Sequence, residues 1–88
     1  MSILSAQCRA ARALIDMSQA TLARRAVVPH DAIADFENGS RTLSLDNLAA
    51  IRAALEAAGV IFIDENGEGP GVRLRKKGTG FETLASIR

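Results

Sequence analysis

The chain has 88 residues, of which 48% are hydrophobic and 3% aromatic, and its net charge is +1. This length allows one domain with a thin core, while a single cysteine and a single histidine exclude an internal disulfide and a four-ligand structural zinc site within one chain. No apolar run reaches the length of a membrane span and the first residues lack a signal-peptide pattern, so we expect a cytoplasmic protein without a cofactor or a metal.

The first two predicted elements are helices, over residues 3–15 and 19–26. Apolar residues of the first helix recur every three or four positions, as one helical face requires; they are Leu4, Cys8, Ala11 and Ile15. We expect Cys8 to be a core residue and not a redox switch. Ser18 is suited to cap the second helix, because its hydroxyl can accept a hydrogen bond from an amide one turn later. The inward residues of that helix are Leu22, Ala23 and Ala26.

Two further helices are predicted over residues 30–38 and 45–58, joined by an exposed loop. Pro29 suits the start of the first of these helices, and Asn38 with Gly39 suits its end. The expected buried residues are Ala32, Ile33 and Phe36 in the third helix and Leu45, Leu48, Ile51 and Leu55 in the fourth.

The pattern after Gly59 is that of a β-hairpin. Residues 60–63 predict a short buried strand, residues 64–71 a turn-rich loop, and residues 72–75 a half-exposed strand. The glycines of the loop do not indicate a phosphate site, because no helix starts after them. The expected fold is therefore mainly α: a four-helix domain over residues 1–59, a hairpin over residues 60–77 and a tail over residues 78–88.

Charge is distributed unevenly along the chain. Residues 1–25 carry four arginines against one aspartate, residues 26–70 two arginines against eight acidic residues, and residues 71–88 five basic residues against one glutamate. If both ends fold onto one side, the molecule has a basic face that the net charge conceals. Arg24 and Arg25 are expected to belong to a solvated helix face.

The segment from residue 19 to residue 41 resembles the helix-turn-helix of the Xre, or phage-repressor-like, family of DNA-binding proteins. The residues that carry the resemblance are Gln19, Leu22, Ala23, Val28, Ile33, Phe36 and the run Glu37-Asn38-Gly39-Ser40-Arg41, followed by Ser44 and Leu45. The resemblance covers about residues 3–60 and implies a four-helix, repressor-like domain. Val27 departs from it, because the family usually has a left-handed glycine there and a β-branched residue resists that conformation. A turn displaced by one residue is therefore expected.

The resemblance implies a sequence-specific transcriptional regulator, a repressor rather than an activator, whose recognition helix at residues 30–38 enters the major groove of double-stranded DNA. The implied base contacts are His30, Asp31, Asp35 and Gln19. The implied phosphate contacts are Arg9, Arg12, Asn38 and Arg41. It also implies that Arg12 and Glu37 form a partly buried ion pair that fixes the recognition helix.

Several of these residues have structural interpretations as well. Asp31 can stabilise the first turn of its helix, and His30 can be an exposed helix-start residue. Asp35 has no such role and can accept a hydrogen bond from a cytosine amino group, so we interpret it as facing DNA. Both aspartates repel phosphate. Either the protein therefore recognises its own DNA site and binds other DNA weakly, or the domain binds a protein partner instead of DNA. The alternative function is thus a protein-binding helix-turn-helix adaptor or an antitoxin. An enzyme is not expected, since no nucleophile, base and orienting group occur together.

The predicted hairpin is a candidate dimer interface, because residues 60–63 are too apolar to remain a free edge. Pairing with the same segment of a second chain would give a two-fold homodimer, with recognition helices about 34 Å apart on a palindromic operator. The expected interface residues are Val60, Ile61, Phe62, Ile63, Val72 and Leu74. The basic residues Arg73, Arg75, Lys76 and Lys77 either protect the strand edge or add flanking phosphate contacts.

Overall fold

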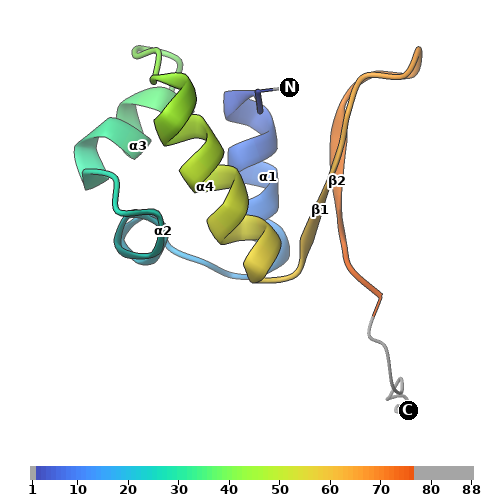
Figure 1. Ribbon diagram of the computed structural model, residues 1–88, viewed down its shortest axis with the longest axis horizontal. Helices are drawn as coiled ribbons and strands as arrows, with labels where there is room; N and C mark the ends of the chain where they lie inside the picture. Colours follow the sequence, from blue (N-terminus) through green and yellow to red (C-terminus); the bar gives the residue numbers. More distant parts are fainter. Residues whose placement is uncertain (1, 77–88) are drawn as a thin grey trace.

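The computed structural model describes residues 2–76 and contains four α-helices followed by two antiparallel β-strands (Figure 1). The elements are α1 (Ser5–Leu14), α2 (Gln19–Ala26), α3 (His30–Glu37), α4 (Leu45–Ala57), β1 (Val60–Ile63) and β2 (Gly71–Leu74). The predicted fold class is confirmed, and the predicted helix boundaries agree within about two residues. Lys77 and the predicted tail at residues 78–88 lie outside the described residues.

Local hydrogen bonds set the ends of the helices. Ser18 and Ser44 cap α2 and α4, and each hydroxyl accepts a hydrogen bond from the amide three residues later, at 3.0 and 3.1 Å. At the end of α3, Gly39 adopts a left-handed conformation with φ of 85°. The amide of Ser40 then reaches back to the carbonyl of Asp35 at 2.9 Å, which closes the helix and turns the chain towards α4.

One aliphatic core joins the four helices to the inner face of the hairpin. The inward residues predicted for α2 and α3 are all buried, which confirms the periodicity of these two helices. The largest side chains without solvent exposure are Leu22, Ile33, Ile51, Leu55, Val60 and Cys8.

Two residues that the helical spacing placed in the core lie on the surface. Leu4 is 52% exposed and Leu45 is 74% exposed, so both predictions were wrong. Leu4 precedes the first turn of α1 in an extended conformation, and the neighbouring Ile3 is buried in its place. Leu45 is the first residue of α4, and Leu43 from the preceding loop fills the core beside it. Helical periodicity does not extend past a helix end, which is why both assignments failed.

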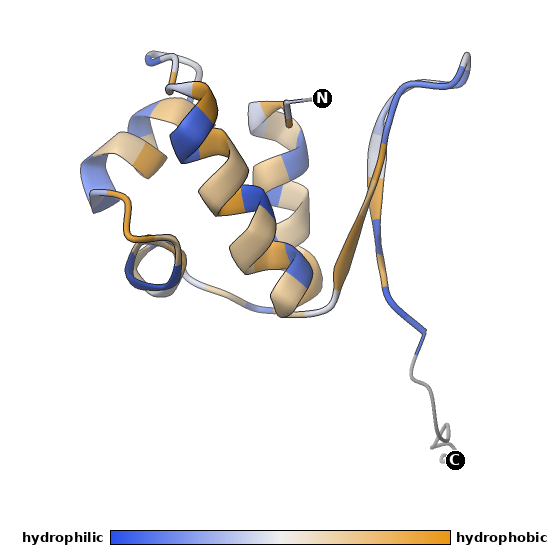
Figure 2. Ribbon diagram, in the orientation of Figure 1, coloured by the Kyte–Doolittle hydropathy of each residue, from blue (hydrophilic) through white to orange (hydrophobic). Residues whose placement is uncertain are grey.

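The hairpin packs its inner face on α1 and α4. Val60 pairs with Leu74 and Phe62 pairs with Val72. Val60 and Phe62 are buried while Ile61 and Ile63 are half-buried, so the strand predicted to be buried throughout has one inner and one outer face. Figure 2 shows β1 hydrophobic along its length, whereas β2 also contains hydrophilic residues.

Gln7 ties the hairpin to α1, although it was not among the residues predicted from the sequence to be important. Its side-chain oxygen accepts a hydrogen bond from the amide of Leu4 at 2.8 Å. Its side-chain nitrogen donates to the carbonyls of Gly71 and Ile63 at 3.1 and 3.5 Å. A glutamine three residues after a helix-capping position is the local signal for the first bond. The bonds to the strands join residues more than fifty positions apart, and no local pattern indicates them.

The hairpin and α3 lie on opposite sides of the molecule, with α1 and α4 between them (Figure 1). On the α4 side, the guanidinium of Arg52 lies 5.3 Å from the centre of the Phe62 ring and donates to Glu56 at 3.0 Å. Arg52 thus fills the seam between α4 and β1. No helix among residues 2–76 has the length and hydrophobicity needed to cross a membrane.

The turn between α2 and α3 is not displaced by a residue, and that expectation was wrong. Val27 itself adopts the left-handed conformation, with φ of 56° and ψ of 50°, and its side chain is 87% exposed. Val28 is buried and its amide donates to the carbonyl of Ala23 at 3.1 Å. Burial of Val28 fixes the position of the turn, so Val27 accepts a conformation that costs a β-branched residue about 1–2 kcal/mol.

Val27→Gly should therefore raise the free energy of unfolding by about 1 kcal/mol, since glycine adopts this conformation without strain and little buried surface is lost. Urea unfolding followed by circular dichroism measures the change. Val28→Gly, one residue later, is the matched control and should destabilise the protein because it empties a core position. A Val27→Gly protein less stable than the unmodified chain would contradict this interpretation.

Candidate nucleic-acid interface

α2 and α3 form the two helices of a helix-turn-helix arrangement, and only the inner side of α3 is covered. Ala32, Ile33 and Phe36 are buried against the core, whereas His30 and Asp31 at the amino end are exposed. Asp35, one turn later, has a side chain that is 48% exposed. The structure thus brings three of the four expected base contacts together on the outer side of α3.

The buried carboxylate of Glu37 joins α3 to the two helices beside it. Its side chain is only 3% exposed, yet it accepts hydrogen bonds from α1 and from α2. Arg12 donates through Nε at 2.7 Å and through Nη2 at 2.6 Å, which is the two-pronged geometry that a guanidinium offers a carboxylate. The sulfur of Cys8 donates at 3.1 Å and Nε2 of Gln19 at 2.9 Å. The expected ion pair between Arg12 and Glu37 is confirmed.

Arg12 and Arg9 hold further backbone groups near the same place. The remaining terminal nitrogen of Arg12 donates to the carbonyl of Met17 at 2.9 Å, at the start of the connection to α2. Arg9 donates to the backbone carbonyl of Glu37. The end of α3 is therefore fixed through both its side chain and its main chain. We call the side chains of Cys8, Arg9, Arg12, Gln19 and Glu37 the Glu37 cluster.

Burial and hydrogen bonding act in opposite directions on the acidity of Glu37. Burial alone raises the pKa of the carboxyl group, but hydrogen bonds from Arg12, Gln19 and Cys8 together lower it below its ordinary value of 4.5. The pKa of the Cys8 thiol is raised, first by burial and then by its bond to Glu37. Cys8 consequently remains a protonated donor inside the core, in accordance with its expected core position and not with a reactive thiolate.

Gln19 lies at the amino end of α2 as expected, but its amide group is turned towards Glu37 and not outward. The donor that a contact with DNA would use is engaged inside the protein. The structure therefore makes Gln19 a residue that positions α3. No local sequence pattern signals this role, because the two residues are brought together only when α2 and α3 fold against each other.

The four expected phosphate contacts differ in how far their side chains are exposed and already hydrogen-bonded within the protein. Arg9 and Arg41 have exposed side chains, and Arg41 lies 3.9 Å from Asp35. The side-chain oxygen of Asn38 accepts a hydrogen bond from the amide of Ser40 at 2.9 Å, which leaves its exposed amino group available. In Arg12 all three guanidinium nitrogens already donate within the protein, and its side chain is 20% exposed. Arg12 is thus mainly a structural residue.

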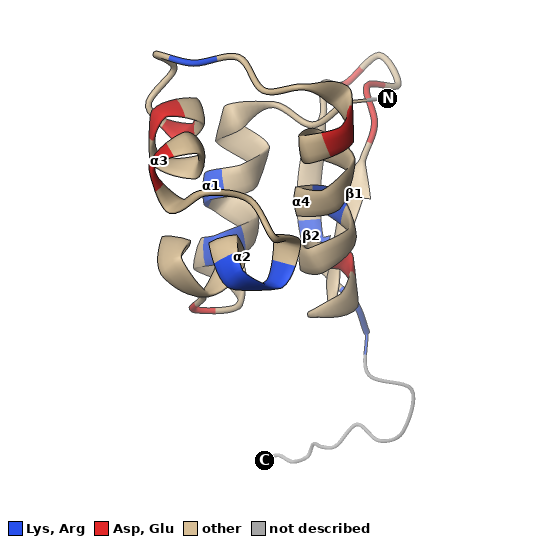
Figure 3. Cartoon of the chain, turned by 60° about the vertical axis from the view of Figure 1, so that its left-hand side comes forward, with Lys and Arg blue, Asp and Glu red and all other residues tan. Residues whose placement is uncertain are grey.

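Charges of opposite sign occupy neighbouring helices. Figure 3 shows acidic residues along α3 and basic residues on α1 and α2. The exposed arginines of α2 are Arg24 and Arg25, as expected for a solvated face. A duplex that meets α3 would thus encounter two carboxylates at the centre of the contact and arginines around them. Among residues 2–76, no group of three or more histidine, cysteine, aspartate or glutamate side chains is arranged to hold a metal ion.

A comparison with known protein families gives a match to this part of the chain. A family model described as helix-turn-helix matches residues 9–57, which is more than half of the chain and reaches from the middle of α1 to the last residue of α4. No curated protein matches the chain.

The lowered pKa of Glu37 predicts a loss of stability in acid. A carboxyl group with a lower pKa in the folded state stabilises the fold above its unfolded pKa, and this contribution disappears as the pH falls through the folded pKa. The free energy of unfolding should therefore differ most between the unmodified protein and Glu37→Gln at neutral pH. The difference should narrow at pH about 3. Urea unfolding at both pH values measures it, and a difference that grows in acid would contradict the assignment.

Proposed function

The chain belongs to the helix-turn-helix family, and we propose that this DNA-binding regulator is a repressor that recognises a palindromic operator as a homodimer, with α3 in the major groove. The observation that carries the proposal is the outer side of α3, which the protein leaves uncovered while the Glu37 cluster fixes the helix from within. A rigid helix with an open face can enter the major groove without rearranging the domain.

Base recognition in this proposal rests on His30, Asp31 and Asp35. A carboxylate can accept a hydrogen bond from the amino group of cytosine, and both aspartates lie on the open side of α3. Arg41, close to Asp35, reduces the repulsion between that carboxylate and nearby phosphates. We therefore expect an operator with cytosine opposite the middle of α3, and weak binding to unrelated sequences.

Phosphate contacts in this proposal come from the residues around α3. Arg9 and Arg41 supply exposed positive charge, and Asn38 supplies the free amino group at the carboxyl end of the helix. Such contacts provide affinity without sequence information. Arg73, Arg75 and Lys76 stand on the hairpin side, away from α3 (Figure 1), which favours a role for them other than contact with the same duplex.

The homodimer in this proposal uses the outer side of the hairpin. Val60 and Phe62 are buried in the core of their own chain, so they cannot meet a partner as first expected. Ile61 and Ile63 face the other way and are half-buried. Covering this face with the same face of a second chain gives a two-fold dimer, and its recognition helices would lie a whole number of DNA turns apart.

Immunoprecipitation of the tagged protein across its genome identifies bound sequences, and titration of an enriched duplex then tests recognition. The enriched duplex should bind on the order of a thousand times more tightly than random DNA, with affinity that falls steeply as salt rises. Asp35→Ala should weaken operator binding about tenfold or more and leave binding to random DNA equal or stronger, because a negative charge is removed. Glu68→Ala, in the distant hairpin loop, is the matched control and should change neither.

An absence of enriched sites, or equal affinity for the enriched and the random duplex, would overturn the proposed function. The first result would favour the alternative of a protein-binding adaptor or an antitoxin. Loss of random binding in Asp35→Ala would show that the residue acts on general affinity and not on base choice.

Sedimentation equilibrium tests the dimer separately. The unmodified chain should have twice the monomer mass, and Ile61→Lys should have the monomer mass, since a charge on the outer face of β1 cannot be buried against its own copy. Leu45→Lys places the same charge at an exposed apolar residue away from the hairpin and should remain dimeric. A dimer that persists in Ile61→Lys would exclude this interface.

A further inference from the structure

The outer edge of β2 has backbone groups that point away from the hairpin. The amide of Arg75 donates to the carbonyl of Gly59 at 2.7 Å, so these two residues form a hydrogen-bonded pair. Along an antiparallel ladder, hydrogen-bonded pairs alternate with pairs whose backbone groups do not bond to each other. Val72 and Leu74 belong to the intervening pairs. Their N–H and C=O groups therefore point outward, where another strand could pair with them.

A hollow beside this edge lies between β2 and α1. Its volume is about 280 Å³, and its lining is almost entirely apolar; it comprises Leu4, Ala6, Gln7, Ala10, Pro70, Gly71 and Val72. On the α1 side the hollow is bordered by the small side chains of Ala6 and Ala10. At the other edge of the sheet the long side chain of Arg52 occupies the seam with α4. The two edges thus differ, and the β2 edge is the one with room for another segment of chain.

The β2 edge beside this hollow carries positive charge. Arg73 on β2 and Lys76 just beyond it are exposed along this edge, whereas Arg9 donates to the carbonyl of Glu37 on α3 and Arg75 to the carbonyl of Glu56 on α4. No aspartate or glutamate occurs in α1 or between residues 70 and 76. A second copy that paired β2 with β2 would bring these basic residues against one another, which opposes such pairing. The charge favours an acidic occupant.

We propose that the groove between α1 and β2 binds an extended acidic segment of a partner protein, which adds to β2 as a third strand. Side chains alternate along a strand. Apolar residues of the segment would therefore pack on Leu4 and Ala10, and the acidic residues between them would face Arg73 and its neighbours. Backbone pairing supplies affinity in this mode of recognition, and the alternate side chains supply specificity.

This groove lies on the hairpin side, whereas α3 lies on the other side of α1 and α4 (Figure 1). A partner segment bound there leaves α3 uncovered, so the protein can hold the partner and DNA at once. The proposal thus concerns a second surface and does not depend on the DNA-binding proposal.

A fluorescein-labelled decapeptide of alternating valine and glutamate is the probe, and fluorescence anisotropy measures its affinity for the full chain. The peptide should bind, and affinity should fall as salt rises. Leu74→Pro should weaken binding about tenfold, because it removes one outward N–H donor. Leu74 is 51% exposed and its N–H lies outside the β1–β2 ladder, so thermal unfolding and DNA affinity should remain unchanged.

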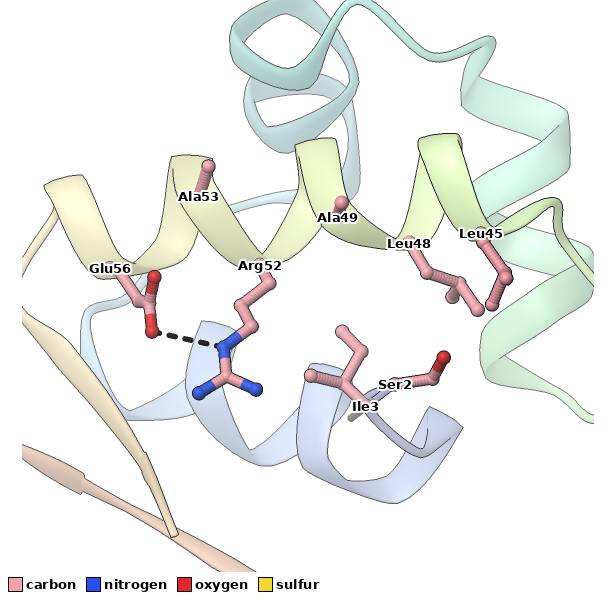
Figure 4. A pocket seen from close by; sticks show the side chains of 8 residues that line it. All are labelled: Ser2, Ile3, Leu45, Leu48, Ala49, Arg52, Ala53 and Glu56. Atoms are coloured by element: carbon pink, nitrogen blue, oxygen red, sulfur yellow. Dashed lines mark hydrogen bonds and ion pairs between the residues drawn. The ribbon is translucent and has the colours of Figure 1, made fainter. Parts of the chain in front are cut away.

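A second variant fills the groove without touching the strand. Ala10→Leu should weaken peptide binding by about the same factor through steric exclusion. Ala53→Leu is the matched control; it lies in a separate hollow of about 470 Å³ between α4 and the amino-terminal residues (Figure 4). This variant should leave peptide binding unchanged. As a control for charge, a decapeptide of alternating valine and lysine should bind the unmodified chain about tenfold more weakly than the acidic peptide.

Three results would overturn the proposal. They are failure of the acidic peptide to bind, equal binding of the lysine peptide, and unchanged peptide affinity in both Leu74→Pro and Ala10→Leu. Loss of self-association in Leu74→Pro would also overturn it, since the edge would then belong to a second copy. None of these results bears on whether α3 binds DNA, which the operator titration decides.

Discussion

A buried carboxylate determines how the three amino-terminal helices are arranged. Glu37 carries a negative charge into the core, and such a charge is tolerated only when donors surround it. Those donors are Arg12 and Cys8 from α1 and Gln19 from α2. They reach Glu37 together only when the helices adopt one relative position. The same requirement therefore stabilises the fold and fixes the direction of the recognition helix, and the open side of α3 follows from it.

α1 connects the two surfaces that we assign to this protein. Arg9 and Arg12 on this helix hold the end of α3. On the same helix, Gln7 donates to a backbone carbonyl of each strand. The domain thus separates a helix that is open to DNA from a hairpin whose edge and outer face are open to protein. Such a separation suits a regulator that a protein partner controls, because the partner does not compete for the duplex.

Local patterns in the sequence predicted the helices, their caps and the hairpin, because capping, periodicity and alternation depend on neighbouring residues. The resemblance added the pair of Arg12 and Glu37. The features that local patterns did not predict depend on contacts between distant residues or occur at helix ends. Gln7 and Gln19 find their partners only in the folded chain. Val27 takes a conformation that its type resists, because the burial of Val28 outweighs the local preference.

The most direct test of the central claim is Arg12→Met, with the free energy of unfolding and the affinity for the enriched operator measured on the same protein. If the Glu37 cluster positions α3, leaving the buried carboxylate without its main partner should lower stability by about 3 kcal/mol. Operator binding should also weaken under conditions where the variant remains folded. Unchanged stability together with unchanged operator affinity would show that the recognition helix does not depend on this ion pair.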